Sequence, residues 1–160
     1  MFRELNRKSR ELFRAECLEV LTKETRGVLS VNGDDGYPYG MPINFYYSPE
    51  DGCIYFHSGK RNQSHRMDAL KRSDKACFCV VEQGTKAEGE WAYTARSVIV
   101  FGRVEIIDDA EIAVPIAVAL SHKFTDDEHF IRREVERFAK ATTLFKLIPE
   151  HMCGKRVKEE

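Results

Sequence analysis

The feature of this sequence that most constrains its fold is a change of hydrophobic period near residue 25. Before that point, apolar residues recur at helical spacing over about residues 8–24, which predicts an N-terminal amphipathic helix. After it come three short apolar segments, 26–32, 37–47 and 53–57, separated by turn-forming sequences at 33–36 and 48–52. This alternation of apolar runs and turns predicts three strands in an antiparallel meander.

The rest of the chain continues the same plan. Further strands are expected at 75–82, 97–107 and 141–148, and Gly102 predicts a bulge or bend in the second of them. A short helix capped by Asn62 or Ser64 should end near residue 72, and two more helices should cover about 109–122 and 126–139. Residues 150–160 are expected to form a polar tail. The sequence therefore predicts an α+β protein, a small closed or nearly closed barrel of six antiparallel strands with peripheral helices.

Composition excludes several classes of protein. A chain of 160 residues fits one domain, and a net charge of −1 argues against a general nucleic-acid binder. No apolar run approaches the roughly 18 residues of a membrane span, and the first residues lack the apolar core of a secretion signal. The five cysteines contain no C-x-x-C pair, and His122, His129 and His151 have no partners at metal-ligand spacing. We expect a cytoplasmic protein with neither a disulfide framework nor a metal site.

The strongest chemical signal is the segment 57–66, His-Ser-Gly-Lys-Arg-Asn-Gln-Ser-His-Arg. It leaves a strand, turns at a glycine and enters a helix, whose N-terminus presents free N–H groups and partial positive charge. Three strong cations and two serine hydroxyls add the groups that bind phosphate. Taken alone, the segment also fits a solvated basic loop before a capped helix. The Walker A motif is absent, which argues against a nucleotide P-loop.

A second signal lies in the segment 35–47. Pro38, Gly40 and Pro42 interrupt an otherwise regular strand pattern. Proline cannot donate to a strand ladder, so such residues belong at an edge or a bulge, where backbone groups are free to meet a ligand. The aromatic residues of the segment could pack against a planar ring, although aromatic residues on strands more often belong to the core.

These segments resemble the FMN-binding split barrels related to pyridoxamine 5'-phosphate oxidase, and most closely their nitroimidazole reductase (Nim) branch. The resemblance extends from about residue 8 to 158 and is carried by residues 27–30, 35–45, 54–58, 65–70 and 97–103. The run Gly-Tyr-Pro-Tyr-Gly-Met-Pro-Ile-Asn, residues 36–44, followed by Tyr-Phe-His-Ser, residues 55–58, is its most specific part. Residues 151–155 resemble the closing H-x-T-G-K motif of the family, with Cys153 where threonine is common.

The resemblance implies a six-stranded split β-barrel that forms a homodimer, with FMN bound in the subunit interface. It places the isoalloxazine ring along the second strand and the end of the third, near Met41, Pro42, Ile43, Asn44, His57 and Ser58. It assigns the phosphate to the family's contact triplet, here Ser64, His65 and Arg66, with Lys60 as a further candidate. Arg66 stands where lysine is commoner, which keeps the charge and adds a fork suited to phosphate. Trp91 and Ser97 are expected to reach the flavin from the partner subunit.

His57 is the candidate catalytic residue. Imidazole can donate a proton near neutral pH, which the reduction of a nitro group or a quinone needs. The alternative is a histidine that only hydrogen-bonds a backbone carbonyl. Since no Rossmann fingerprint is present, NAD(P)H is expected to bind transiently. The expected function is an FMN-dependent oxidoreductase that passes electrons from a nicotinamide donor to a small acceptor such as a nitroaromatic compound.

Two other functions remain open at this stage. One is a flavin-binding or flavin-storage protein without catalysis. The other is a haem- or deazaflavin-binding relative on the same barrel, because one fold can carry several ligands. Pyridoxamine phosphate oxidase activity itself is not expected, because the chain is short and lacks that enzyme's Arg-x-x-x-Arg-Leu-x-Pro ending.

Overall fold

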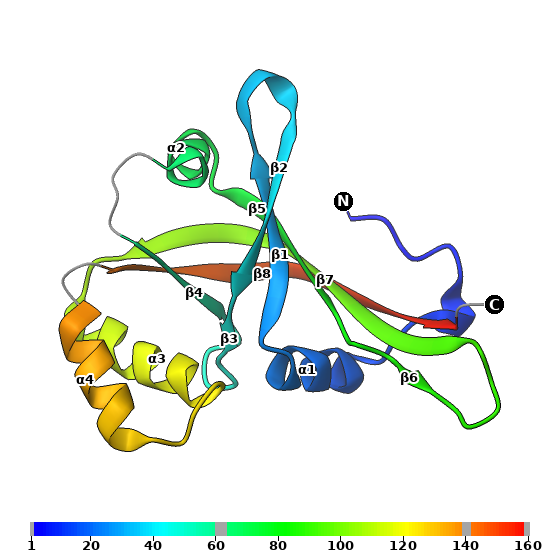
Figure 1. Cartoon of the computed structure of the whole chain (residues 1–160). Helices are drawn as coiled ribbons and strands as arrows, with labels where there is room; N and C mark the ends of the chain where they lie inside the picture. The colour runs from blue at the N-terminus through cyan, green and yellow to red at the C-terminus, as the bar shows by residue number, and fades with distance from the viewer. Residues whose placement is uncertain (1, 60–63, 139–141, 159–160) are drawn as a thin grey trace.

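The computed structural model describes residues 2–59, 64–138 and 142–158 as a curled antiparallel sheet with helices at its margins (Figure 1). The helices are η1 Lys8–Arg10, α1 Arg14–Lys23, η2 Asp34–Gly36, α2 His65–Arg72, α3 Ala110–His122 and α4 Glu128–Phe138. The strands are β1 Arg26–Asn32, β2 Pro38–Asn44, β3 Tyr46–Tyr47, β4 Ile54–Gly59, β5 Lys75–Val81, β6 Thr85–Lys86, β7 Tyr93–Ile107 and β8 Thr142–Lys158.

The barrel is closed by a single bent segment, residues 38–47. The strand order is β2-β1-β5-β7-β8-β4-β3, so β2 and β3 stand at opposite ends of the sheet although only Phe45 separates them in the chain. The first part of the segment pairs with β1 and the last part with β4. If this segment is counted as one strand and β6 as a short addition to β7, the structure has the predicted six strands. The α+β split-barrel prediction is confirmed.

Four fully buried phenylalanines form the centre of the core. Phe78 on β5 packs edge-on against Phe45 and Phe56, with ring centroids 4.9 Å apart in both pairs. Phe56 on β4 stacks on Phe145 of β8 at 5.2 Å. Because these rings come from strands on opposite sides of the curled sheet, their burial stabilises the closed form.

The predicted bulge at Gly102 is confirmed. The register of β7 on β8 shifts between Phe101 and Gly102, which pair with His151 and Pro149, so Glu150 has no residue opposite it. A Cβ atom at Gly102 would lie 2.1 Å from the carbonyl oxygen of Ile148, so only glycine fits at this close approach. The bulge also accommodates Pro149, which has no N–H to donate to the ladder.

The predicted polar tail is wrong, because β8 continues to Lys158. Its last part pairs with β7 from His151 opposite Phe101 to Lys158 opposite Thr94. The polar side chains of this stretch belong to a strand whose backbone groups are satisfied by β7, and composition alone does not reveal that pairing. Gly154 in this stretch is buried against α1, where a Cβ would lie 2.4 Å from the sulfur of Cys17.

The N-terminal helix is shorter than predicted. Residues 8–10 form the turn η1, and α1 covers Arg14–Lys23. Between them the chain follows β8: Glu11 forms a bridge with Lys155, and the N–H of Leu12 donates to the carbonyl of Gly154 at 3.0 Å. These sheet contacts replace the first turns of the expected helix.

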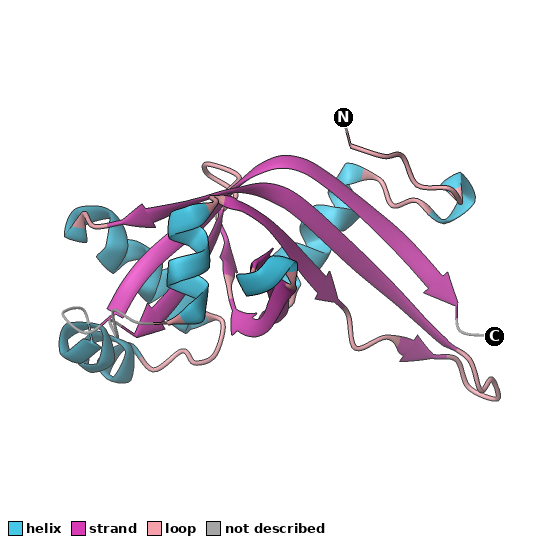
Figure 2. Cartoon of the chain, turned by 90° about the horizontal axis from the view of Figure 1, so that it is seen from above, coloured by secondary structure: helices cyan, strands magenta, loops and turns pink. Residues whose placement is uncertain are grey.

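The helices α3 and α4 lie at one end of the long strands β7 and β8, and the β6–β7 hairpin lies at the other end (Figure 2). Side chains of α3, such as Ala113 and Ile116, cover a second apolar cluster of Cys53, Tyr55 and Leu144. No helix within the described ranges combines the length and the apolar character that crossing a bilayer requires.

Candidate functional site

The helix α2 begins where the sequence predicts a phosphate site. Ser64 is its N-cap, and the Ser64 hydroxyl accepts a hydrogen bond from the N–H of Met67 at 3.3 Å. The first turn of such a helix has N–H groups without intrahelical acceptors and carries partial positive charge. Lys60, a predicted phosphate ligand, lies outside the described residues. The cap and the start of α2 thus place Arg66 in the first, electropositive turn.

Arg66 reaches from α2 across two strands. Its Nη2 donates to Ser58 Oγ on β4 at 2.5 Å, and its Nη1 lies 3.5 Å from the sulfur of Met41 on β2. The guanidinium carbon lies 5.2 Å from the centre of the Phe145 ring on β8, within cation–π range. Three predicted site residues, Met41, Ser58 and Arg66, are therefore in direct contact, with Phe145 beside the guanidinium.

The charge of Arg66 has no acidic partner within the part of the chain that the structure describes. Among the described residues, no carboxylate forms an ion pair with it, and its Nε is buried without a hydrogen-bond acceptor. Burial lowers the pKa of this guanidinium, although arginine stays charged at neutral pH. A half-buried cation with an unused donor is unfavourable unless an anion binds it. The residues at this point therefore fit a phosphate or a similar oxyanion.

His57 and Ser58 point to opposite faces of β4, as neighbouring residues on a strand must. Ser58 shares the face of buried Phe56, whereas His57 shares the face of Tyr55 and is exposed on its outer side. Surrounding protein atoms and the nearby Arg66 cation lower the pKa of His57 below its ordinary value of 6.5. The lowered pKa favours the neutral imidazole of His57 at pH 7, and the Arg66 cation is near enough to contribute to this shift.

His65, the first residue of α2, contacts the β1–β2 hairpin. Its ring stacks on Tyr39 of β2 with centroids 4.2 Å apart. Its Nε2 lies 3.3 Å from the carboxylate of Asp34, in the turn between β1 and β2. Through His65 and Arg66, the first turn of α2 is attached to the inward face of β2, where Tyr39 and Met41 lie.

The predicted ring-binding residues of β2 alternate between its two faces. The side chains of Met41 and Ile43 turn inward, and Ile43 is 8% exposed, so a ligand can meet Ile43 only through its backbone. Pro42 and Asn44 face outward, and the Asn44 side-chain oxygen accepts a hydrogen bond from Arg26 Nε at 3.0 Å. Because β2 stands at the end of the strand order, one of its edges lacks a neighbouring strand in the described sheet. That edge can offer backbone groups to a ligand.

Trp91 and Ser97 lie away from this cluster within the chain. Trp91, 71% exposed, follows β6 in the hairpin that projects at the opposite end of the sheet from α2 (Figure 1). Ser97 pairs with Val81 and Lys155 in the middle of the sheet. A single chain does not bring either residue to Arg66.

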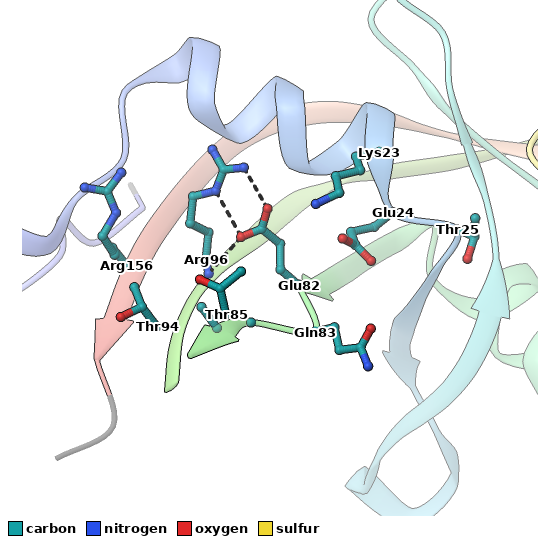
Figure 3. Close-up of a pocket in the computed structure, with 11 residues that line it drawn as sticks. Lys23, Glu24, Thr25, Glu82, Gln83, Thr85, Thr94, Arg96 and Arg156 are labelled. Carbon is teal, nitrogen blue, oxygen red and sulfur yellow. Dashed lines mark hydrogen bonds and ion pairs between the residues drawn. The ribbon is translucent and has the colours of Figure 1, made fainter. Parts of the chain in front are cut away.

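An open groove of about 590 Å³ lies near the β6–β7 hairpin, away from the predicted site (Figure 3). Its central cation, Arg96, already forms hydrogen bonds with Glu82 at 2.7 and 3.0 Å and with Glu19 at 2.8 Å. These carboxylates raise the pKa of Arg96, and their negative charges balance its positive charge. Volume alone does not make this groove a stronger candidate than the unpaired Arg66.

Three residues of the site region make contacts that the sequence did not predict. Phe145 resembles any core residue of a strand, and nothing in its local sequence shows that it lies beside Arg66. Asp34 was explained by its turn, and Tyr39 by its strand. Only the spatial arrangement shows that both contact His65.

The sequence profile of the pyridoxamine 5'-phosphate oxidase family matches residues 14–156. A comparison with curated proteins finds no match. Three solved structures of low sequence identity share the fold, and the similarity shows the fold alone. A proposed 5-nitroimidazole antibiotic resistance protein from Bacteroides thetaiotaomicron is 19% identical, with a TM-score of 0.74 over 92% of this chain and 87% of that one.

The second is a FAD-binding protein from Mesorhizobium loti, 22% identical, with a TM-score of 0.65 over 92% of this chain and 97% of that one. The third is a FAD and haem binding protein from Mycobacterium smegmatis, 20% identical, with a TM-score of 0.68 over 89% of this chain and 70% of that one.

Proposed function

Because the chain belongs to the pyridoxamine 5'-phosphate oxidase family, we propose that it is a flavoprotein that binds FMN beside α2. The observation that carries the proposal is the half-buried Arg66 guanidinium, which has an unused Nε and no acidic partner among the described residues. A terminal phosphate would bind Arg66, the Ser64 cap and His65, together with Lys60. The ring would lie along β2, against Met41 and the backbone of Ile43, near Pro42, Asn44 and Ser58.

The proposed activity is that of an oxidoreductase similar to the nitroimidazole reductases. Bound flavin would supply the redox chemistry, with a transient NAD(P)H as donor and a small nitroaromatic compound as acceptor. Since the Bacteroides protein with the same fold is named for 5-nitroimidazole resistance, nitroimidazoles are the first acceptors to test. His57, close to Arg66, would orient the acceptor and supply a proton to it. Since its pKa is lowered, we expect this proton transfer to be faster on the acid side of neutrality.

We also propose that two copies of the chain form the working unit, in a cytoplasmic protein. Pro42, Val28, Cys79, Ile99 and Cys153 form one row across five strands on the outer face of the sheet. None of the five is buried in the single chain, and Val28 is 39% exposed. We propose that a second copy covers this apolar row and contributes its Trp91 and Ser97 to the site at the β2 edge, which the single chain does not do.

The decisive experiment is the absorbance spectrum of the purified protein, followed by mass analysis of the released ligand. Two flavin bands and a mass equal to FMN are expected. An intense Soret band would instead identify a haem protein. Stopped-flow bleaching with NADH or NADPH, followed by reoxidation with a nitroimidazole, tests the enzyme. A flavin that neither donor reduces would leave a flavin-binding or storage protein.

Arg66→Ala tests the proposed phosphate contact. We expect roughly 10- to 100-fold weaker FMN binding, the effect of losing charged hydrogen bonds, with riboflavin binding almost unchanged. Lys71→Ala is the matched control, because it removes an exposed cation of the same helix that pairs with Asp68. Equal effects of the two substitutions on FMN binding would show that Arg66 supplies only general charge.

A further inference from the structure

A single carboxylate joins both ends of α2 to the β1–β2 hairpin. Asp34 Oδ1 accepts a hydrogen bond from Arg72 at 2.6 Å, and Asp34 Oδ2 lies 3.3 Å from His65 Nε2. His65 is the first residue of α2 and Arg72 the last, two turns apart on one face of the helix. Asp34 thus holds the helix along its length.

The hairpin is shaped to receive His65. The turn that carries Asp34 has Asp35 and Gly36 at φ values of 55° and 79°. A hydrogen bond from the N–H of Gly33 to the carbonyl of Tyr37, at 2.9 Å, closes this turn. A Cβ at Gly33 would lie 3.6 Å from His65 Nε2, so the imidazole lies directly against the turn. Tyr39 thus contacts the face of the His65 ring, and the turn at Gly33 contacts its edge.

This arrangement leaves one nitrogen of His65 for a ligand. Nε2 faces Asp34, and Nδ1 has no partner among the residues that the structure describes. The two ring nitrogens point in different directions, and a carboxylate on one of them favours a proton there and fixes the ring orientation. His65 precedes Arg66, whose guanidinium has the unused Nε.

We propose that Asp34 is a positioning residue of the phosphate site: it orients His65, and with it the first turn of α2, for contact with the FMN phosphate. This inference rests on the proposed function. Asp34 touches no ligand itself and acts through the His65 ring. Asp34 should therefore affect the binding of FMN, which carries a phosphate, and not the binding of riboflavin, which carries none.

The sign of the effect separates positioning from simple electrostatics. Asp34 is an acidic residue near an anion site, so its removal should strengthen phosphate binding if charge alone mattered. Positioning predicts the opposite. We expect Asp34→Ala to weaken FMN binding roughly threefold to tenfold and to leave riboflavin binding unchanged. Asp68→Asn removes a carboxylate of α2 that pairs with Lys71 and does not contact the hairpin, and it should leave FMN binding unchanged or slightly stronger.

The coupling to His65 is tested by a double-mutant cycle on the full chain, with both flavins titrated by fluorescence quenching. In the His65→Ala background, Asp34→Ala should cause no further loss of FMN binding, because the His65 ring through which Asp34 acts is gone and its remaining contact, Arg72, lies at the far end of α2. An undiminished Asp34→Ala effect in that background would overturn the proposal. So would unchanged or stronger FMN binding by Asp34→Ala alone, or an equal loss of FMN and riboflavin binding.

The outcome for the wild-type protein separates this inference from the proposed function. Wild-type protein that binds neither flavin overturns both. Wild-type protein that binds FMN more tightly than riboflavin, together with an inert Asp34→Ala, overturns the role of Asp34 alone.

Discussion

Arg66 and His57 are both partly desolvated, near opposite faces of β4, and respond differently. Burial lowers the pKa of both side chains. Arginine starts so far above neutrality that it stays charged, whereas histidine starts at 6.5 and becomes neutral at pH 7. One end of the site therefore holds a permanent cation and the other a neutral group that can still hydrogen-bond. A bound phosphate would have a fixed counter-charge, and a substrate near His57 would meet a group whose charge depends on pH.

The titration of His57 predicts a pH dependence of stability in the ligand-free protein. Below about pH 6.5 the unfolded chain binds a proton at His57 that the folded protein does not yet bind. The free energy of unfolding should therefore decrease as the pH falls from 7 through 6.5 toward the lowered pKa. In His57→Gln, the free energy of unfolding should fall less steeply over this pH range. The difference from the wild type should be less than about 1 kcal/mol, because the ring is partly exposed.

Urea unfolding between pH 5 and 7.5 measures this effect. His129→Gln, at an exposed position of α4, is the control and should follow the wild type. The same slope in His57→Gln and in the wild type would contradict the lowered pKa.

At the scale of elements, the pairing of β7 with β8 depends on one close approach. Gly102 lies at the register shift, and a methyl group there would overlap the backbone of Ile148. Gly102→Ala must move one of two long paired strands, so we expect it to destabilise the protein by about 1–3 kcal/mol or more. Gly59→Ala, at a strand glycine where no described residue lies within 4 Å of the added methyl, should change stability by less than about 0.5 kcal/mol.

Denaturant unfolding of both glycine variants, with the flavin absent, gives the comparison. Similar midpoints for Gly102→Ala and Gly59→Ala would show that β8 can shift freely at the bulge. The register of β8, the strand that bears Phe145, would then not depend on the bulge.

At the scale of the whole molecule, the outer row of Pro42, Val28, Cys79, Ile99 and Cys153 predicts assembly. Ile99→Lys places a charge at the middle of this row and should convert a dimer to a monomer. If the partner completes the site, the same substitution should also release FMN. Phe130→Lys changes an exposed residue of α4, 44% exposed and outside the row, and should preserve the dimer. Sedimentation with detection at the flavin band reads mass and ligand together, and a wild-type monomer that retains flavin would contradict the shared site.

The elements that depend on local sequence were predictable. The bounds of β1 agree with the predicted strand at 26–32, and the helix expected at 109–122 is α3, which begins one residue later with Asp109 as its cap. Period, caps and turn residues are properties of neighbouring residues, so the sequence contains them directly. The extension of β8 to Lys158 depends on pairing with β7, more than 40 residues away in the chain, and local composition does not encode it.

The candidate site shows the same division. The basic segment before α2 was visible as a phosphate candidate, because helix start, cations and hydroxyls are close in sequence. The residues around this segment could not be predicted in the same way, because the contacts join four separate elements, which contribute Met41, Ser58, Arg66 and Phe145. The family resemblance assigns both His57 and Ser58 to the isoalloxazine ring, but strand alternation places their side chains on opposite faces of β4.

Because Arg66 contacts Phe145, a newly made chain can complete its proposed flavin site only late in synthesis. Phe145 belongs to β8, which the ribosome makes after every other strand of this sheet. A nascent chain that stops before β8 contains Met41, Ser58 and Arg66 but lacks Phe145 beside the guanidinium, and β4 has only the short strand β3 as a neighbour. Cofactor loading would then follow the arrival of the last strand, and bound flavin would mark chains whose folding is complete.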